Sequence, residues 1–177
     1  MKEPTLLSSQ EVYAGKVFRI YREKFLTEKG ETEVEVVKHR GAVAVLPILP
    51  DKRVVLERQF RYTLREFIYE VPAGTLEENE RPEDCARREL LEETGLTAKK
   101  IIYLTRIVMS PGYVDETIHL FVAYVSDERQ EARLERDEII STEIYTMDQA
   151  LEMIRNGKIV DAKTVSLLLL ARFLGLV

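Results

Sequence analysis

An uninterrupted apolar run, Ala42–Ile48, constrains the fold more than any other feature of the chain. A strand with one exposed face alternates apolar and polar residues, whereas a continuous apolar run is typical of a strand covered on both faces. A turn at 50–52 follows, and a second strand is predicted over 53–57. The run therefore predicts a sheet with helices packed against it.

The rest of the chain mixes strand and helix patterns. Strands are predicted over residues 67–71, 101–108, 118–125 and 139–145, and helices over 82–94, 147–156 and 160–173. Pro82 suits the first turn of the central helix, and Gly95 suits its C-terminal end. This order predicts an α+β fold with a mixed sheet.

The N-terminal segment is predicted to be a small antiparallel β-region. Residues 17–26 are rich in β-forming types, 28–31 form a turn, and 32–37 alternate. A sheet of two or three strands is marginal alone, so it must pack on the rest of the chain or on a second copy. We expect residues 1–40 to form a dimerising β-region and 41–177 the main domain.

Composition excludes several classes of protein. The net charge of −5 argues against a nucleic-acid partner, which usually needs basic excess. The single cysteine excludes an internal disulfide framework, and His39 and His119 lie too far apart to suggest a zinc pair. The longest apolar run, 167–171, is far below the ~20 residues of a membrane span. Residues 1–10 lack the apolar core of a signal peptide, so we expect a cytoplasmic protein without a membrane partner.

Three glutamates share one face of the predicted central helix. Glu89, Glu92 and Glu93 lie at positions i, i+3 and i+4, and Glu80 precedes the helix. Alone, these residues would favour a solvated acidic surface. Their mutual repulsion would also be relieved by a hard cation such as Mg²⁺, which prefers carboxylate and carbonyl oxygens.

The complete pattern around these residues is far more specific. It comprises, in order, Gly74, Glu80, Arg88-Glu89, Leu90, Glu92-Glu93, Gly95 and Leu96, with five residues before Glu80 and seven before Arg88. This stretch resembles the Nudix box at every fixed position, without a gap. The resemblance implies an α/β/α sandwich that hydrolyses a nucleoside diphosphate linked to another moiety.

The same resemblance implies roles for individual residues. The implied metal ligands are the carbonyl of Ala73 and the carboxylates of Glu89, Glu92 and Glu93, with Glu92 also a catalytic candidate. They would hold two or more Mg²⁺ ions, for which Mn²⁺ could substitute. Arg88 and Glu80 are implied to hold the helix to the preceding loop.

Features outside the box resemble the ADP-ribose pyrophosphatase subfamily. Pro111 lies sixteen residues after Gly95, and residues 58–61 read Arg-Gln-Phe-Arg. Residues 70–74 resemble the subfamily's approach to the box, and 157–164 resemble the start of its C-terminal helix, which we interpret as structural. The implied substrate-binding residues are Arg58, Arg61, Glu70 and Pro111. A guanidinium fork suits a diphosphate. The resemblance implies hydrolysis of ADP-ribose to AMP and ribose 5-phosphate, with some tolerance for other ADP-sugars.

Other functions remain open from the sequence. NADH, FAD, GDP-sugars or oxidised nucleoside triphosphates are alternative Nudix substrates, and an RNA-end hydrolase or a non-catalytic nucleotide sensor are further alternatives. The intact box disfavours a sensor, and the net charge disfavours RNA.

The catalytic base is predicted on an acidic loop. The box glutamates are implied metal ligands, so a separate carboxylate should take the proton of the attacking water. The run 135–138 resembles the loop that supplies this base in the subfamily. We prefer Glu138, and a shifted alignment would place Glu135 or Asp137 there instead.

Overall fold

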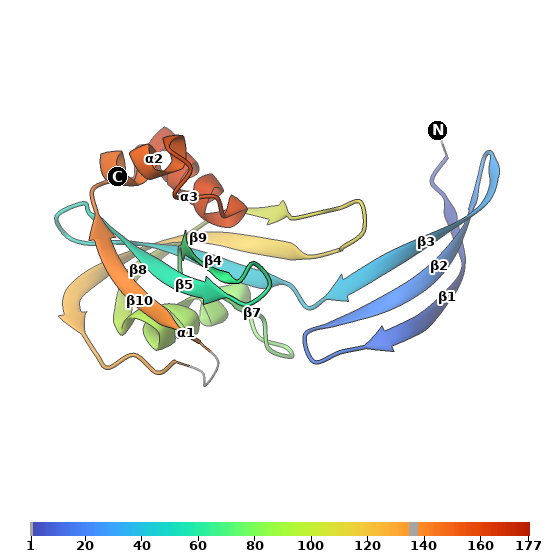
Figure 1. Ribbon diagram of the computed structural model, residues 1–177, viewed down its shortest axis with the longest axis horizontal. Helices are drawn as coiled ribbons and strands as arrows, with labels where there is room; N and C mark the ends of the chain where they lie inside the picture. The colour runs from blue at the N-terminus through green and yellow to red at the C-terminus, as the bar shows by residue number, and fades with distance from the viewer. Residues whose placement is uncertain (1, 135–137) are drawn as a thin grey trace. The chain divides into compact units, whose positions relative to one another are not determined.

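The computed structural model describes residues 2–134 and 138–177 (Figure 1). The chain forms two compact units, one of residues 1–41 with 108–117 and one of residues 42–107 with 118–177. The first unit thus takes in a later segment in addition to the predicted N-terminal region. The domain division at residue 40 stays a prediction.

The first unit is built on a three-stranded antiparallel sheet in the order β1-β2-β3. Its strands are β1 (Thr5–Ala14), β2 (Phe18–Thr27) and β3 (Gly30–His39). The later segment joins β3 through main-chain bonds, because Val37 N–H donates to Tyr113 O at 2.8 Å and Asp115 N–H donates to Val37 O at 3.1 Å. The sequence predicted β2 and β3 but missed β1, whose residues are all exposed and carry no burial pattern.

This sheet has no apolar core of its own. Among the described residues 2–41, no apolar side chain is buried, and the buried side chain in the strands is that of Glu23. Large apolar side chains are instead exposed, namely Leu6, Leu7, Val12, Tyr13, Val17, Phe18, Leu26 and Val34.

The second unit contains a mixed sheet of seven strands. Five of them follow the order β10-β5-β4-β9-β8, and the other two pair at its side, β6 with β5 and β7 with β4. The strands are β4 (Ala42–Ile48), β5 (Val54–Arg61), β6 (Glu66–Glu70), β7 (Ala73–Thr75), β8 (Leu96–Val108), β9 (Thr117–Arg129) and β10 (Ile140–Tyr145). Strand β4 pairs parallel with β9 and antiparallel with β5 and β7.

Helices cover both faces of this sheet. Helix α1 (Pro82–Thr94) lies on one face, and α2 (Met147–Arg155) and α3 (Ala162–Phe173) lie on the other (Figure 1). Val43 and Val45 pack in one buried cluster with Leu90 of α1, and the alternate residue Leu46 is also fully buried. The predicted α+β sandwich with a doubly covered strand is confirmed.

Helix α1 begins and ends where the sequence predicted. Pro82 occupies its first turn, and Gly95 ends it with φ 70° while its N–H donates to Leu91 O at 2.9 Å. A Cβ on Gly95 would lie 2.1 Å from Gln130 O, so the position requires glycine. Within the described part of the chain, no helix has the length and apolar character needed to cross a membrane.

Candidate active site

The three glutamates of α1 differ in their surroundings. Glu89 and Glu93 are buried, with 8% and 4% of their surface exposed, and Glu92 is half-buried. Leu90 on the same helix packs into the core against the sheet. The helix therefore holds two carboxylates at the edge of the core rather than in bulk water.

The backbone of β7 borders these carboxylates. A Cβ on Gly74 would lie 1.9 Å from Glu89 Oε1, so the chain can pass there only as glycine unless Glu89 moves. Ala73 N–H donates to Glu93 Oε2 at 2.9 Å. The structure thus brings Ala73, Glu89 and Glu93 together, and their role as metal ligands stays a prediction.

Arg88 ties the helix to the preceding loop. Its Nε and Nη2 donate to the two oxygens of Glu80 at 2.9 Å each. Its Nη1 donates to Glu89 at 2.6 Å and to Glu92 at 3.2 Å. The hydrogen bonds from Arg88 lower the pKa of Glu80 to about 2, so this carboxylate stays ionised at neutral pH. The structural roles predicted for Arg88 and Glu80 agree with these contacts.

Burial shifts the pKa of three other carboxylates in the opposite direction, those of Glu89, Glu93 and Glu57. It raises the pKa of Glu89, and it raises the pKa of Glu93 well above the usual range, with further contributions from Glu57 and Glu89. Burial also raises the pKa of Glu57 on β5 to about 8, with Glu70 and Glu138 adding to the shift. Such a cluster of buried carboxylates is stabilised by a cation.

The donor set fits a hard divalent cation. Carboxylate and main-chain carbonyl oxygens are the ligands that Mg²⁺ and Mn²⁺ accept. Within residues 2–134 and 138–177, no three acidic, histidine or cysteine side chains already stand in a coordinating arrangement. In the structure, Glu89 accepts a hydrogen bond from Arg88, and Glu93 accepts one from Ala73 N–H.

A buried ion-pair chain holds one of the predicted substrate-binding arginines. Arg61 Nε donates to Glu70 Oε2 at 2.7 Å. Lys163 Nζ donates to the other oxygen of Glu70 and, at 2.9 Å, to Asp161. Glu70 therefore fixes Arg61 rather than projecting into open space. From the sequence we interpreted the segment that contains Lys163 as structural, and its ion pair with Glu70 was not predicted. A lysine in the first turn of an apolar helix could have indicated such a buried partner.

Two other predicted substrate-binding residues, Arg58 and Pro111, make different contacts. Arg58 lies on the opposite face of β5 from Arg61, because the two are an odd number of positions, three, apart on the strand. Its guanidinium stacks on Phe67, 4.3 Å from the ring centroid. Pro111 belongs to the first unit, in a turn closed by Tyr113 N–H donating to Ser110 O at 3.1 Å. Their substrate contacts stay predictions.

Of the three candidates for the catalytic base, the structure describes one, Glu138. Glu135 and Asp137 lie outside the described residues. Glu138 is described, and its carboxylate contributes to the raised pKa values of Glu57, Glu89 and Glu93. The structure therefore places Glu138 near the carboxylates of α1.

Glu57 is a buried acid near these carboxylates that sequence reasoning missed. It is 1% exposed, and it stands in β5 among the buried residues Val55, Leu56 and Gln59. The signal was a glutamate inside an otherwise buried strand, where an unpaired charge is costly.

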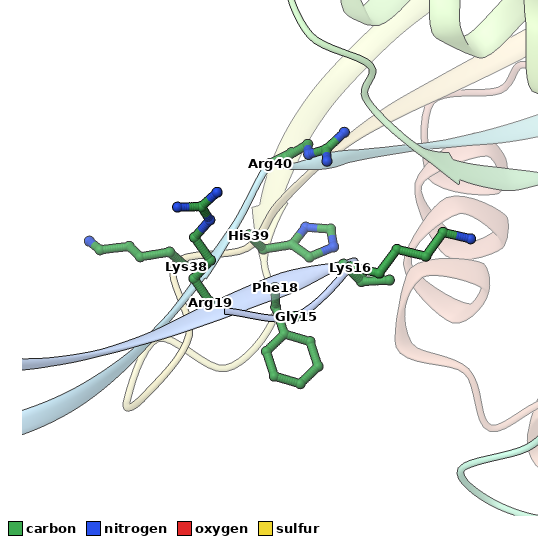
Figure 2. A pocket seen from close by; sticks show the side chains of 8 residues that line it. Gly15, Lys16, Phe18, Arg19, Lys38, His39 and Arg40 are labelled. Atoms are coloured by element: carbon green, nitrogen blue, oxygen red, sulfur yellow. The ribbon is translucent and has the colours of Figure 1, made fainter. Parts of the chain in front are cut away.

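The first unit carries a basic hollow of about 240 Å³ (Figure 2). Its lining includes Lys16, Arg19, Lys38, His39 and Arg40. Arg19 pairs with Glu11 at 2.9 Å, Lys38 pairs with Asp115 at 3.3 Å, and the labelled basic side chains spread outward in Figure 2 rather than converging. His39 Nδ1 accepts from Gly41 N–H at 3.1 Å, in agreement with its predicted structural role.

Comparison with known proteins relates this site to one family. The NUDIX domain family matches residues 38–168. ADP-ribose pyrophosphatase of Bacillus subtilis (strain 168) is 39% identical over 164 residues, which cover 92% of this chain and 89% of that protein. Methanol dehydrogenase activator of Bacillus methanolicus is 37% identical over 165 residues, covering 92% and 89%. GDP-mannose pyrophosphatase of Escherichia coli O139:H28 is 40% identical over 151 residues, covering 76% and 78%.

A solved structure shares the fold. The crystal structure of an ADP compounds hydrolase superposes with a TM-score of 0.83 and covers 97% of this chain and 94% of its own. At 21% identity, this likeness concerns the fold alone.

Proposed function

Because the chain belongs to the Nudix family, whose hydrolases cleave pyrophosphate bonds, we propose that its substrate is ADP-ribose, cleaved to AMP and ribose 5-phosphate. The observation that carries this proposal is the set of buried carboxylates, Glu89 and Glu93, packed against the Ala73-Gly74 backbone. The choice of ADP-ribose is supported by the 39% identity to an ADP-ribose pyrophosphatase over nearly the whole chain.

We propose that Mg²⁺ is the physiological metal and that Mn²⁺ can replace it. The carboxylates of Glu89, Glu92 and Glu93 and the carbonyl of Ala73 would hold the ions. When bound, the cations would neutralise the charge of the diphosphate and lower the pKa of a nearby water.

Arg61 is proposed to bind the diphosphate. Its guanidinium is held by Glu70, and Glu70 is held in turn by Lys163, so the orientation of the fork is fixed before substrate arrives. A preorganised fork can donate two parallel hydrogen bonds to phosphate oxygens at little entropic cost.

Glu138 is proposed as the general base. Its carboxylate accepts a proton from the water whose oxygen forms the new bond to phosphorus. The bond from that phosphorus to the bridging oxygen breaks, and the bridging oxygen leaves with the other phosphate. The place of Glu138 near Glu57, Glu89 and Glu93 supports this role.

The exposed sheet of the first unit is proposed to form a homodimer. Leu6, Leu7 and Val12 on β1 are each more than 40% exposed, and the sheet buries no apolar side chain among its described residues. A second copy would cover this surface, in line with the two-fold symmetry usual for homodimers. Light scattering on the full chain should give twice the monomer mass at micromolar concentration, and a monodisperse monomer would contradict the proposal.

A sugar nucleotide with another base is the second candidate substrate. The 40% identity to a GDP-mannose pyrophosphatase over 76% of this chain favours it. A panel of ADP-ribose, GDP-mannose, NADH and FAD with Mg²⁺ or Mn²⁺ separates these candidates. We expect the highest kcat/KM with ADP-ribose. A higher value for GDP-mannose would transfer the assignment, and no hydrolysis of any nucleotide would leave a non-catalytic sensor.

A further inference from the structure

One buried carboxylate oxygen lacks a hydrogen-bond partner. Glu57 Oε1 is buried, and among the residues that the structure describes no group donates to it. Glu57 itself is 1% exposed, so its carboxyl group has almost no contact with bulk solvent. An unpaired buried carboxylate is costly, and a partner that is absent from the protein alone would explain its position.

The side chain of Glu57 faces the same side of the sheet as α1. Val55, two residues earlier on β5, packs in the buried cluster with Ala86 and Leu90 of α1. Because side chains alternate along a strand, residues 55 and 57 point to the same face. Glu70, the register partner of Glu57 on β6, shares that face.

The charged groups around Glu57 are the acids Glu70, Glu93 and Glu138 and the cations Arg61 and Lys163. Glu93 and Glu138 both interact with it electrostatically, so it belongs to the carboxylate cluster of the site. The nearby cations are engaged elsewhere, since both Arg61 and Lys163 donate to Glu70. The cluster therefore contains a further buried carboxyl group, and the hydrogen bonds from Arg61 and Lys163 go to Glu70 rather than to Glu57.

We propose that Glu57 is an additional ligand of the metal site, contributing Oε1 from the sheet, opposite the carboxylates that α1 supplies. The inference rests on the proposed metal-dependent hydrolysis and adds a residue outside the Gly74–Leu96 pattern. A hard divalent cation satisfies the orphan oxygen and offsets the repulsion among the acids.

Metal binding without substrate tests this assignment. Free Mn²⁺ is measured by electron paramagnetic resonance while the full chain is titrated, for the parent, Glu57→Gln and Glu66→Gln. Glu66 is a matched control, because it lies on the neighbouring strand β6 and is exposed. Glu57→Gln should lose one bound Mn²⁺ or weaken one site by about tenfold or more, and Glu66→Gln should match the parent.

Thermal melting supplies a second readout. Mn²⁺ should raise the Tm of Glu57→Gln less than that of the parent, since ligand-induced stabilisation follows affinity. Glu57→Asp keeps the carboxyl group on a side chain that is shorter by one methylene, so it should bind Mn²⁺ more weakly than the parent. This variant tests the proposal if Glu57→Gln does not fold.

The outcomes separate the two proposals. If the parent binds Mn²⁺ and hydrolyses ADP-ribose while Glu57→Gln or a folded Glu57→Asp binds Mn²⁺ with parent stoichiometry and affinity, Glu57 is not a ligand. It is then a protonated structural acid. If the parent itself binds no Mn²⁺, the proposed metal-dependent function fails and this inference with it.

Discussion

Arg88 donates hydrogen bonds to both carboxylate oxygens of Glu80, from Nε and Nη2 at 2.9 Å each. Its Nη1 donates to Glu89 and Glu92. One guanidinium thus joins the loop before α1 to two of the proposed metal ligands. We propose that the pair supports the site structurally and takes no part in the chemistry.

Glu80→Gln should lower the free energy of unfolding at pH 7 by about 1–3 kcal/mol, because a charge-assisted pair is lost. The pKa of Glu80 is lowered to about 2 in the folded protein, so its stabilisation is complete above the ordinary glutamate pKa and disappears as pH falls through about 2. Urea denaturation between pH 7 and pH 2 should show the gap between parent and variant closing with acid. Glu78→Gln, an exposed neighbour, is the control, and equal stability of parent and Glu80→Gln at pH 7 would contradict the account.

Gly74→Ala should impair activity far more than stability. The new methyl group would meet the carboxylate of Glu89 at 1.9 Å, and this flexible end of the side chain can swing away at little cost. We expect the free energy of unfolding to change by about 1 kcal/mol or less and kcat with Mg²⁺ to fall by at least about tenfold. Denaturation and steady-state kinetics on the same sample check both parts. Parent kcat would show that the position of Glu89 does not matter.

Arg61→Ala should raise KM for ADP-ribose by about 10–100-fold, because the fork aimed at the diphosphate is removed. Arg61→Lys should recover only part of the affinity, since an ammonium cannot make two parallel bonds. Arg58→Ala, measured in parallel, removes an arginine that stacks on Phe67 on the other face of β5. Parent KM in Arg61→Ala would remove the fork from substrate binding.

The base is tested by Glu138→Gln beside Glu135→Gln. Loss of the proton acceptor should lower kcat of Glu138→Gln by about 10²–10⁴-fold with little change in KM. Normal kcat in Glu138→Gln with a collapse in Glu135→Gln would transfer the role to Glu135. Normal rates in both variants would remove this loop from the mechanism.

Local signals predicted the central elements of the fold well. Helix α1 ends where proline and glycine mark its limits, and β4 coincides with its apolar run, because these features depend on backbone geometry and burial of the segment itself. Strands β1 and β7 escaped prediction for opposite reasons. The first is exposed throughout, and the second is three residues long and held by its pairing with β4.

The candidate site was predictable where its spacing is local. Glu89 and Glu93 share a helix face by periodicity, so their neighbourhood follows from one segment. Glu57 and Lys163 come from a strand and a helix distant in sequence, and only the folded sheet brings Glu57 near Glu93 and Lys163 to Glu70. Patterns within one segment of the sequence therefore cannot predict that these residues lie close to Glu93 and Glu70.

The most direct test of the account measures AMP formation from ADP-ribose by the parent and by Glu93→Gln, with and without Mg²⁺. The parent should release AMP and ribose 5-phosphate in equal amounts only when Mg²⁺ is present. Glu93→Gln can still accept from Ala73 N–H and should stay folded, yet its kcat should fall by at least about a thousandfold. Hydrolysis of ADP-ribose without a divalent cation, or at the parent rate by Glu93→Gln, would contradict the account.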